Sequence, residues 1–165
     1  GIDNSEVHYQ KEKPKGIGNS ITLPENERKI EKLEEILLAL AEQVTYRLRK
    51  YDLLANTVSV QLRTKDFEDK SHQQKLLAPT SATKEIYTKA KELLVQMFHK
   101  PMAIRLIGLR VDNLVEKENM QMSLFSTNEN KKQENLDKVI DDLKNKYGYN
   151  TVTRAGKMNT NIKFK

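Results

Sequence analysis

The sequence has 165 residues, with 29 Lys and Arg against 23 Asp and Glu, so its formal net charge is +6. Hydrophobic residues make up 37% and charged residues 32%. No apolar run approaches the roughly 20 residues that a membrane-spanning helix needs, so no membrane partner is expected. The length suits one domain with extensions or two very small ones, and the positive charge favours polyanions such as nucleic acid without requiring them.

Cysteine is absent from the whole sequence, which excludes disulfides and thiolate metal sites and fits a cytoplasmic location. The chain begins at Gly1 with neither an initiator Met nor a basic-then-apolar signal peptide. We therefore expect it to be a piece of a longer protein.

The first half of the sequence predicts a polar linker, a strand and a long helix. Residues 1–15 are polar, and residues 17–23 alternate in the manner of a strand that Pro24 ends. Residues 27–51 predict a helix, because apolar side chains recur at three- and four-residue steps: Ile30, Leu33, Leu37, Leu40, Val44 and Leu48.

Residues 57–65 alternate cleanly and predict a strand that is buried on one face only. The apolar positions begin at Val58, and the intervening face is basic and hydroxylated with no acidic residue: Thr57, Ser59, Gln61, Arg63 and Lys65. A second strand is expected over residues 72–78, after a polar turn over residues 66–71.

Pro79, Thr80 and Ser81 provide a helix start, since a breaker precedes two capping hydroxyls. The helix that follows has an apolar face of Ile86, Ala90, Leu93, Leu94 and Met97. Residues 103–114 predict the last strand. A regular strand would place Arg105 and Arg110 on opposite faces, and a bulge at Gly108 would reconcile them.

The predicted order is β-α-β-β-α-β, which defines an α+β fold with two helices on one face of a four-stranded antiparallel sheet. The other face is left open and carries Ser59, Gln61, Arg63 and Lys65, joined by Ser20, Thr22 and one of the two arginines. A third helix is predicted at residues 130–147, ended by Gly148, with helically spaced Leu136, Val139, Ile140, Leu143 and Tyr147.

The sequence provides no complete catalytic site. No pair of carboxylates lies on converging strands to hold two metal ions, and Asp141 and Asp142 are expected on a solvated helix face. The histidines, His8, His72 and His99, lack ligand-like spacing. We expect no cofactor and no catalytic residue in this chain.

The open face suits a phosphate backbone better than bases, because it offers small hydroxyls and long basic side chains. Modules of this topology that bind single-stranded RNA stack bases on exposed strand aromatics, and no predicted strand here has an outward aromatic. An RNA-binding module, or a protein-interaction module with an incidental basic surface, remains the alternative.

A short segment after the last strand stands apart from any core. Gln121-Met122-Ser123-Leu124-Phe125 places a polar residue, two spacers and a Leu-Phe pair before a polar stretch. Extended motifs of this kind bind by placing a few side chains in preformed pockets of a partner.

Several segments, taken in order, resemble the little-finger domain of bacterial Y-family translesion DNA polymerases, of the DNA polymerase IV and UV-damage-repair type. Residues 1–7 resemble the link that leaves the thumb domain, and residues 13–22 resemble the start of the little finger. Residues 104–111 resemble its last strand, and residues 121–125 look like the clamp-binding peptide of bacterial members. The segment from Tyr147 to Gly156 is similar to extensions found in these polymerases.

The resemblance implies a division into a thumb linker (1–15), a little-finger domain (16–115), a clamp-binding segment (116–128) and a helical tail (129–165). The clamp-binding residues would be Gln121, Met122, Ser123, Leu124 and Phe125. The DNA-facing residues would be Lys15, Asn19, Ser20, Arg63, Lys65, Gln74, Lys75, Arg105 and Arg110. Asn19 and Leu106 depart from relatives that are basic there, which implies a weaker or differently distributed grip.

The resemblance also implies a parent DNA-directed DNA polymerase that copies past damaged bases in DNA repair and damage tolerance. Its palm domain, with carboxylates that hold Mg²⁺, would lie upstream. The expected partners are duplex DNA, bound without sequence preference, and the bacterial sliding clamp.

Overall fold

The computed structural model describes residues 12–120, 128–149, 152 and 154. Its elements follow in the order β1 (Gly16–Glu27), α1 (Ile30–Lys50), β2 (Leu53–Thr64), β3 (Asp69–Thr80), α2 (Thr83–Met97) and β4 (Ile104–Asp112). After them come β5 (Val115–Glu116), the 3₁₀ turn η1 (Lys117–Asn119) and α3 (Asn128–Tyr147).

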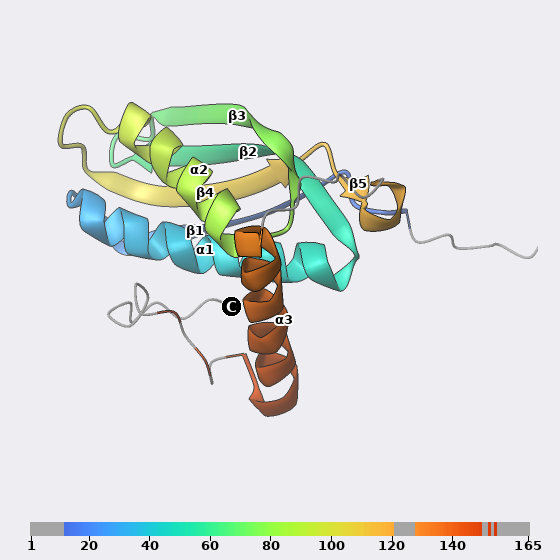
Figure 1. Ribbon diagram of the computed structural model, residues 1–165. Helices are drawn as coiled ribbons and strands as arrows, with labels where there is room; N and C mark the ends of the chain where they lie inside the picture. Colours follow the sequence, from blue (N-terminus) through green and yellow to red (C-terminus); the bar gives the residue numbers. More distant parts are fainter. Residues whose placement is uncertain (1–11, 121–127, 150–151, 153, 155–165) are drawn as a thin grey trace, which may run out of the picture.

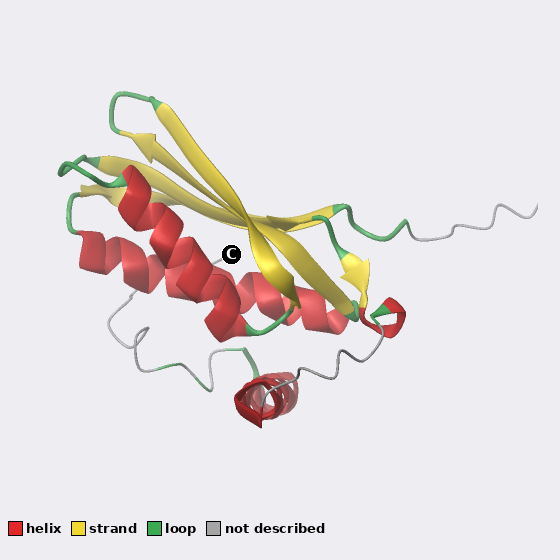
Figure 2. Ribbon diagram, turned by 45° about the horizontal axis from the view of Figure 1, so that its top comes forward, coloured by secondary structure: helices red, strands yellow, loops and turns green. Residues whose placement is uncertain are grey.

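The strands form one antiparallel sheet in the order β1-β4-β2-β3, with the short β5 paired to the start of β2. Helices α1 and α2 cover one face of this sheet, and none of the described helices lies over the opposite face (Figure 1, Figure 2). The predicted α+β class and the β-α-β-β-α-β order are confirmed.

The core lies between the sheet and the two helices. Alternate residues of β2 (Val58, Val60 and Leu62) face it, and they are fully buried. From α1 and α2 come the residues that the helical spacing predicted, among them Leu33, Leu37, Leu40, Val44, Leu48, Ile86, Ala90, Leu93, Leu94 and Met97. Period-two and period-3.6 patterns therefore converge on the same layer.

Element ends differ from those predicted where local breakers lie at sheet edges. β1 continues through Pro24 to Glu27, and the register of its pairing with β4 shifts between Thr22 and Glu27. Proline is tolerated there because β1 is an edge strand and the ladder is already interrupted. The β2–β3 turn is shorter than expected, with Phe67 in the left-handed region at φ 64°.

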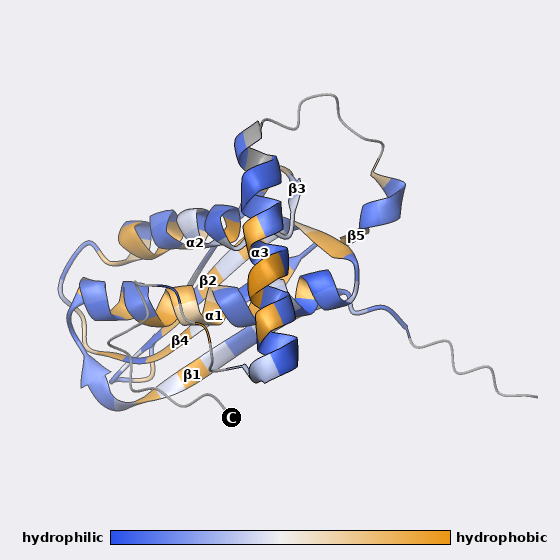
Figure 3. Cartoon of the chain, turned by 60° about the horizontal axis from the view of Figure 1, so that its bottom comes forward, coloured by the Kyte–Doolittle hydropathy of each residue, from blue (hydrophilic) through white to orange (hydrophobic). Residues whose placement is uncertain are grey.

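Helix α3 lies as a third layer across α1, on the side away from the sheet (Figure 1, Figure 3). It ends where predicted: Gly148 has φ 99°, and its N–H donates to the carbonyl of Lys144 at 2.9 Å. Among the described residues, no helix is both long and apolar enough to cross a membrane.

The buried face of α2 predicts a clear stability difference between two positions on that helix. Leu94 is fully buried in the core, so Leu94→Ala should lower the free energy of unfolding by about 2–5 kcal/mol through lost burial and a cavity. Thr88 is exposed on the same helix, and Thr88→Ala should change it by less than about 0.5 kcal/mol. Urea denaturation followed by circular dichroism measures both values, and equal losses would contradict this packing.

Candidate nucleic-acid interface on the open sheet face

The antiparallel registers align four strands on the open face, because directly paired residues point to the same side of a sheet. From β1 across β4 and β2 to β3, these residues form four rows, and we call this set the open face. The rows are Gly16-Asp112-Thr57-Lys75, Gly18-Arg110-Ser59-Gln73, Ser20-Gly108-Gln61-Ser71 and Thr22-Leu106-Arg63-Asp69.

The open face is flattened by glycine on β1 and β4. A Cβ built on Gly108 would lie 3.1 Å from the Cβ of Ser20, and one built on Gly18 would lie 3.1 Å from the Cβ of Arg110. A Cβ on Gly16 would collide with the side chains of Arg110 and Asp112 at under 2.5 Å. Glycine at these positions therefore leaves a shallow surface along which a long arginine side chain lies flat.

Both arginines of the open face are already paired with aspartates. Arg63 makes a bidentate pair with Asp69, with Nε–Oδ1 at 2.7 Å and Nη2–Oδ2 at 2.9 Å. The Nε of Arg110 lies 2.8 Å and 3.0 Å from the two carboxylate oxygens of Asp112. Since β2 itself has no acidic residue, the sequence alone suggested a more basic face than the assembled sheet presents.

The pairing perturbs the titration of its members. The hydrogen bond from Arg63 lowers the pKa of Asp69, and the same bond raises the pKa of Arg63. A carboxyl with a lowered pKa is ionised and paired at every pH above its ordinary pKa. It loses the pairing only as the pH falls through the lowered pKa. The Arg63–Asp69 pair is therefore intact at neutral pH. Both side chains face water, so its contribution to stability is small.

The structure brings together some of the residues predicted to face DNA. Ser20, Arg63, Lys75 and Arg110 share the open face. Lys15 and Lys65 are exposed immediately before β1 and after β2, so they lie at its ends.

Two predicted residues lie elsewhere. The amide nitrogen of Asn19 donates to Gln43 of α1, so its side chain is on the helix side of the sheet. Gln74 pairs with Val58, whose side chain points into the core, so Gln74 is also on the helix side. Its neighbour Gln73 occupies the open face instead, and strand alternation from Lys75, which was predicted to face DNA, could have identified it.

Arg105 has its own arrangement. Pairing skips from Arg63–Leu106 to Thr64–Ile104, which leaves Arg105 as the extra residue of a bulge. Its guanidinium carbon lies 5.1 Å from the ring centroid of Phe67 in the β2–β3 turn. The predicted bulge in β4 exists, but it is at Arg105 and not at Gly108, which pairs regularly with Gln61.

The Gln121–Phe125 segment lies outside the described residues. Over the described part of the chain, no three His, Asp or Glu side chains gather in a group that could hold a metal ion. The open face also carries no aromatic ring in its four rows. It can therefore offer hydroxyls, amides and arginines, which suit contacts to phosphate and sugar oxygens.

Fold and face together define a class: an α+β domain that presents a flat, hydroxyl- and arginine-bearing sheet surface. The chain belongs to the impB/mucB/samB family, whose C-terminal domain matches residues 14–124. The resemblance to the little-finger domain of Y-family polymerases is thereby confirmed.

Relatives of known name are similar along nearly the whole chain. DNA polymerase IV of Clostridium acetobutylicum is 34% identical over 155 residues, which are 94% of this chain and 39% of that protein. DNA polymerase IV of Moorella thermoacetica is 36% identical over 156 residues, 94% of this chain and 38% of that protein. The chain therefore spans about two fifths of the length of these relatives.

Solved structures share the fold. The little-finger domain of PolIV, in a complex with the β-clamp processivity factor, is 23% identical with a TM-score of 0.51. The match covers 67% of this chain and 98% of that one. A Dbh DNA polymerase in an insertion ternary complex is 21% identical with a TM-score of 0.54, over 61% of this chain and 29% of that one.

Because aspartates pair with both of its arginines, the open face should bind anions less strongly than the arginines alone would allow. Asp112→Asn should release Arg110 and strengthen binding of a short DNA duplex by about three- to tenfold, with a steeper dependence on salt, because one more cation is free to displace counterions. Glu92→Gln on the exposed side of α2 is a matched control, since it removes one carboxylate far from the sheet face. Fluorescence anisotropy over 50–300 mM NaCl measures both, and a loss of affinity in Asp112→Asn would contradict the assignment.

Proposed function

We propose that this chain is the DNA-binding and clamp-tethering domain of a translesion DNA polymerase of the DNA polymerase IV type. Membership of the impB/mucB/samB family carries the proposal. The open face supports it, because its chemistry suits the backbone of a duplex and lacks the aromatic platform that base stacking needs. In that role the parent protein acts in tolerance of DNA damage.

The open face would hold DNA through many weak contacts. Hydroxyls of Ser20, Thr22, Ser59 and Ser71 lie in neighbouring rows with the amides of Gln61 and Gln73. Such groups hydrogen-bond to phosphate and sugar oxygens whatever the base sequence. This lack of selectivity is what a polymerase that moves along a template requires.

The catalytic chemistry would belong to the rest of the parent protein. Nucleotidyl transfer needs carboxylates that hold two divalent ions about 4 Å apart, and we assign Mg²⁺ binding to an upstream palm domain. This chain would contribute position, by holding the duplex near the primer end.

The DNA-binding role predicts a specific loss on truncation of the β4 arginines. Arg105→Ala with Arg110→Ala should weaken duplex binding about tenfold or more and reduce the slope of log K against log salt by one to two, as expected when two phosphate contacts are lost. Titrations of the isolated chain with labelled duplex at several salt concentrations measure both quantities.

A matched control is Arg47→Ala with Lys84→Ala, which removes the same charge at exposed positions on α1 and α2, on the helix side of the sheet. This control should retain most of the affinity. If both double variants lost equal affinity, net charge alone would explain binding, and the assignment of the open face would be wrong.

The clamp-tethering role rests on Gln121-Met122-Ser123-Leu124-Phe125. Leu124 and Phe125 are the apolar anchors of the motif, and buried anchors at interfaces contribute of order 2 kcal/mol or more each. Leu124→Ala with Phe125→Ala should therefore weaken binding to a bacterial sliding clamp by at least about 100-fold, as measured by surface plasmon resonance. Ser126→Ala with Thr127→Ala, just past the motif, should change little.

Measuring DNA binding and clamp binding together distinguishes the proposed function from its two alternatives. A protein-interaction module would bind the clamp and leave duplex DNA unbound. An RNA-binding module would prefer single-stranded RNA in competition with duplex DNA. Duplex binding that single-stranded RNA does not displace supports the polymerase role.

A further inference from the structure

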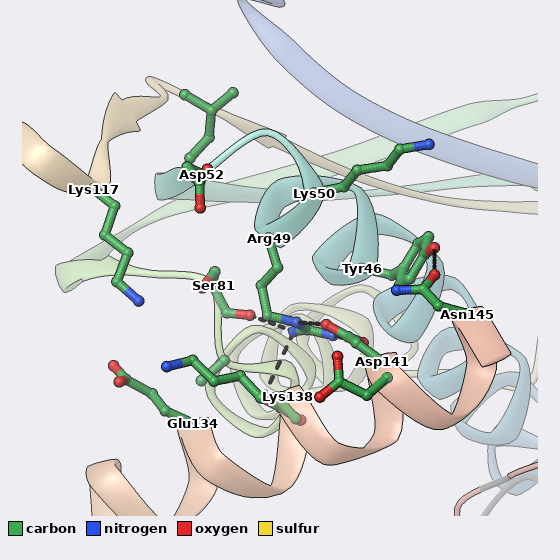
Figure 4. A pocket seen from close by; sticks show the side chains of 14 residues that line it. Tyr46, Arg49, Lys50, Asp52, Ser81, Lys117, Glu134, Lys138, Asp141 and Asn145 are labelled. Carbon is green, nitrogen blue, oxygen red and sulfur yellow. Dashed lines mark hydrogen bonds and ion pairs between the residues drawn. The ribbon is translucent and has the colours of Figure 1, made fainter.

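A cleft of about 400 Å³ lies between the C-terminal end of α1, η1 and α3 (Figure 4). The Nε and Nη2 atoms of Arg49 lie 2.5 Å and 2.9 Å from the two carboxylate oxygens of Asp141, and Asp137 accepts the backbone N–H of Thr83 at 3.1 Å. Asp141 was expected on a solvated helix face, and this expectation is wrong, since its side chain is only 14% exposed. These charges attach α3 to α1 and α2, so they are already paired within the protein.

An aromatic ring lies exposed at the opposite end of the sheet, in the turn that joins β2 to β3 (Figure 1). Phe67 of this turn is 67% exposed. By contrast Phe98, the other phenylalanine that the structure describes, packs against the hydrophobic core. The ring of Phe67 does not belong to the core, so it is available to a partner.

The turn holds Phe67 in a fixed and strained backbone conformation. The N–H of Phe67 donates to the carbonyl of Thr64 at 3.1 Å. The N–H of Thr64 donates to the carbonyl of Glu68 at 3.0 Å, and the N–H of Glu68 donates to the Thr64 hydroxyl at 3.2 Å. Phe67 has φ 64°, a left-handed conformation that is unfavourable for a bulky side chain and that glycine adopts freely. Such strain gathers at ligand-binding sites, which points to a use for the ring beyond the turn itself.

Arg105 stacks on this ring. It is exposed and is the extra residue of the β4 bulge, so its side chain leaves the alternation of the strand. Its guanidinium carbon lies 5.1 Å from the centroid of the Phe67 ring. Arg63 and Arg110 each pair with an aspartate, whereas no carboxylate among the described residues forms an ion pair with Arg105. The cation of Arg105 is therefore available to a phosphate.

The Phe67–Arg105 pair adjoins the last row of the open face. Arg105 directly precedes Leu106 of that row. Phe67 lies in the turn between Arg63 of the same row and its partner Asp69. A DNA strand that leaves the open face at this end would therefore reach both the exposed ring and the guanidinium.

A ring beside a guanidinium provides a surface for a nucleobase. Unpaired bases stack on aromatic rings and on guanidinium planes, and such stacking tolerates every base because each has a π-face. Bases within a duplex are covered by their neighbours, so only an unpaired base can reach the ring. The exposed carboxylates of Asp66 and Glu68 in the same turn repel a run of phosphates. Contact with one base and one phosphate is therefore favoured over a longer backbone track.

We propose that Phe67 and Arg105 form a stacking site for one unpaired base of single-stranded DNA, where that strand continues from the duplex on the open face. This inference rests on the proposed DNA-binding function. The four rows contain no ring and contact the backbone, whereas this site distinguishes single-stranded from duplex DNA. The domain would thereby bind a junction of duplex and single strand more tightly than duplex alone, whatever the base.

The first test compares DNA ligands of equal duplex length on the full chain by fluorescence anisotropy. Duplexes with a short 5′ or 3′ overhang are compared with the blunt duplex, and one of the two polarities should bind at least about fivefold more tightly. The same overhang built from abasic nucleotides keeps the phosphates and lacks the bases, so it should lose most of this gain. Equal affinities of the overhang and blunt duplexes would overturn the stacking site and leave duplex binding standing.

Variants of the ring assign the gain to Phe67. Phe67→Leu keeps an apolar side chain without the ring, so the overhang duplex should fall close to the blunt affinity, which itself stays unchanged. Tyr51→Leu is the matched control, because it removes a ring that is 52% exposed at the end of α1, and it should retain the gain. Phe67→Gly relieves the left-handed backbone, so loss of the gain in this variant also cannot be attributed to misfolding. Retention of the gain in Phe67→Leu would overturn the proposal.

A spectroscopic test reports contact with the base directly. Because the sequence has no tryptophan, Phe67→Trp provides a single fluorophore that retains an aromatic ring at this place. The overhang duplex should quench its fluorescence more than the abasic overhang or the blunt duplex does, and Tyr51→Trp should show no such difference. Equal quenching of Phe67→Trp by all three ligands would overturn the stacking site. Absence of binding to every DNA, with the unmodified chain included, would instead refute the DNA-binding function.

Discussion

The antiparallel register of β1, β4, β2 and β3 is the constraint on which the rest of the structure depends. It sends Val58, Val60 and Leu62 towards α1 and α2 and sends Ser59, Gln61 and Arg63 the opposite way. A slip of one residue in any pair would exchange these faces. The helices are held by one face and the proposed DNA contacts by the other, so folding and binding draw on alternate residues of the same strands.

Much of this division was predictable, because periodicity determines which side chains share a face. The apolar residues of α1 and α2 and the alternation of β2 needed no tertiary information. Alternation alone could have excluded Gln74, because Lys75 was already predicted to face DNA and neighbouring residues of a strand point to opposite faces. The pairing of Gln74 with Val58 shows that Gln73 is the one on the open face. The Arg63–Asp69 pair was hidden because it depends on the register between β2 and β3. Asp112, by contrast, lies two residues after Arg110 on the same strand, so its position on that face follows from alternation.

Helix α3 was predictable as a helix and not as a docked element. Helical spacing of Leu136, Val139 and Leu143 suggests an apolar docking face, whereas Asp137, Asp141 and Lys144 make the contacts. A buried charge is favourable in an interface only when its partner is also there, and the partners Glu42 and Arg49 lie about 90 to 100 residues earlier in the sequence. The sequence pattern within α3 alone does not indicate such pairing. The positions of these side chains were therefore harder to predict than the fold, because they depend on contacts between elements that are distant in the sequence.

The Arg63–Asp69 and Arg110–Asp112 pairs have a consequence for motion along a template. If the proposed DNA-binding role holds, an arginine that leaves a phosphate at this surface would find a carboxylate within reach of the same side chain. Each step would then exchange one partner for another of the same charge, which would keep the barrier to translocation low. The two aspartates would lower the affinity of the sheet for bound DNA, and they would also lower the barrier to each step along the template.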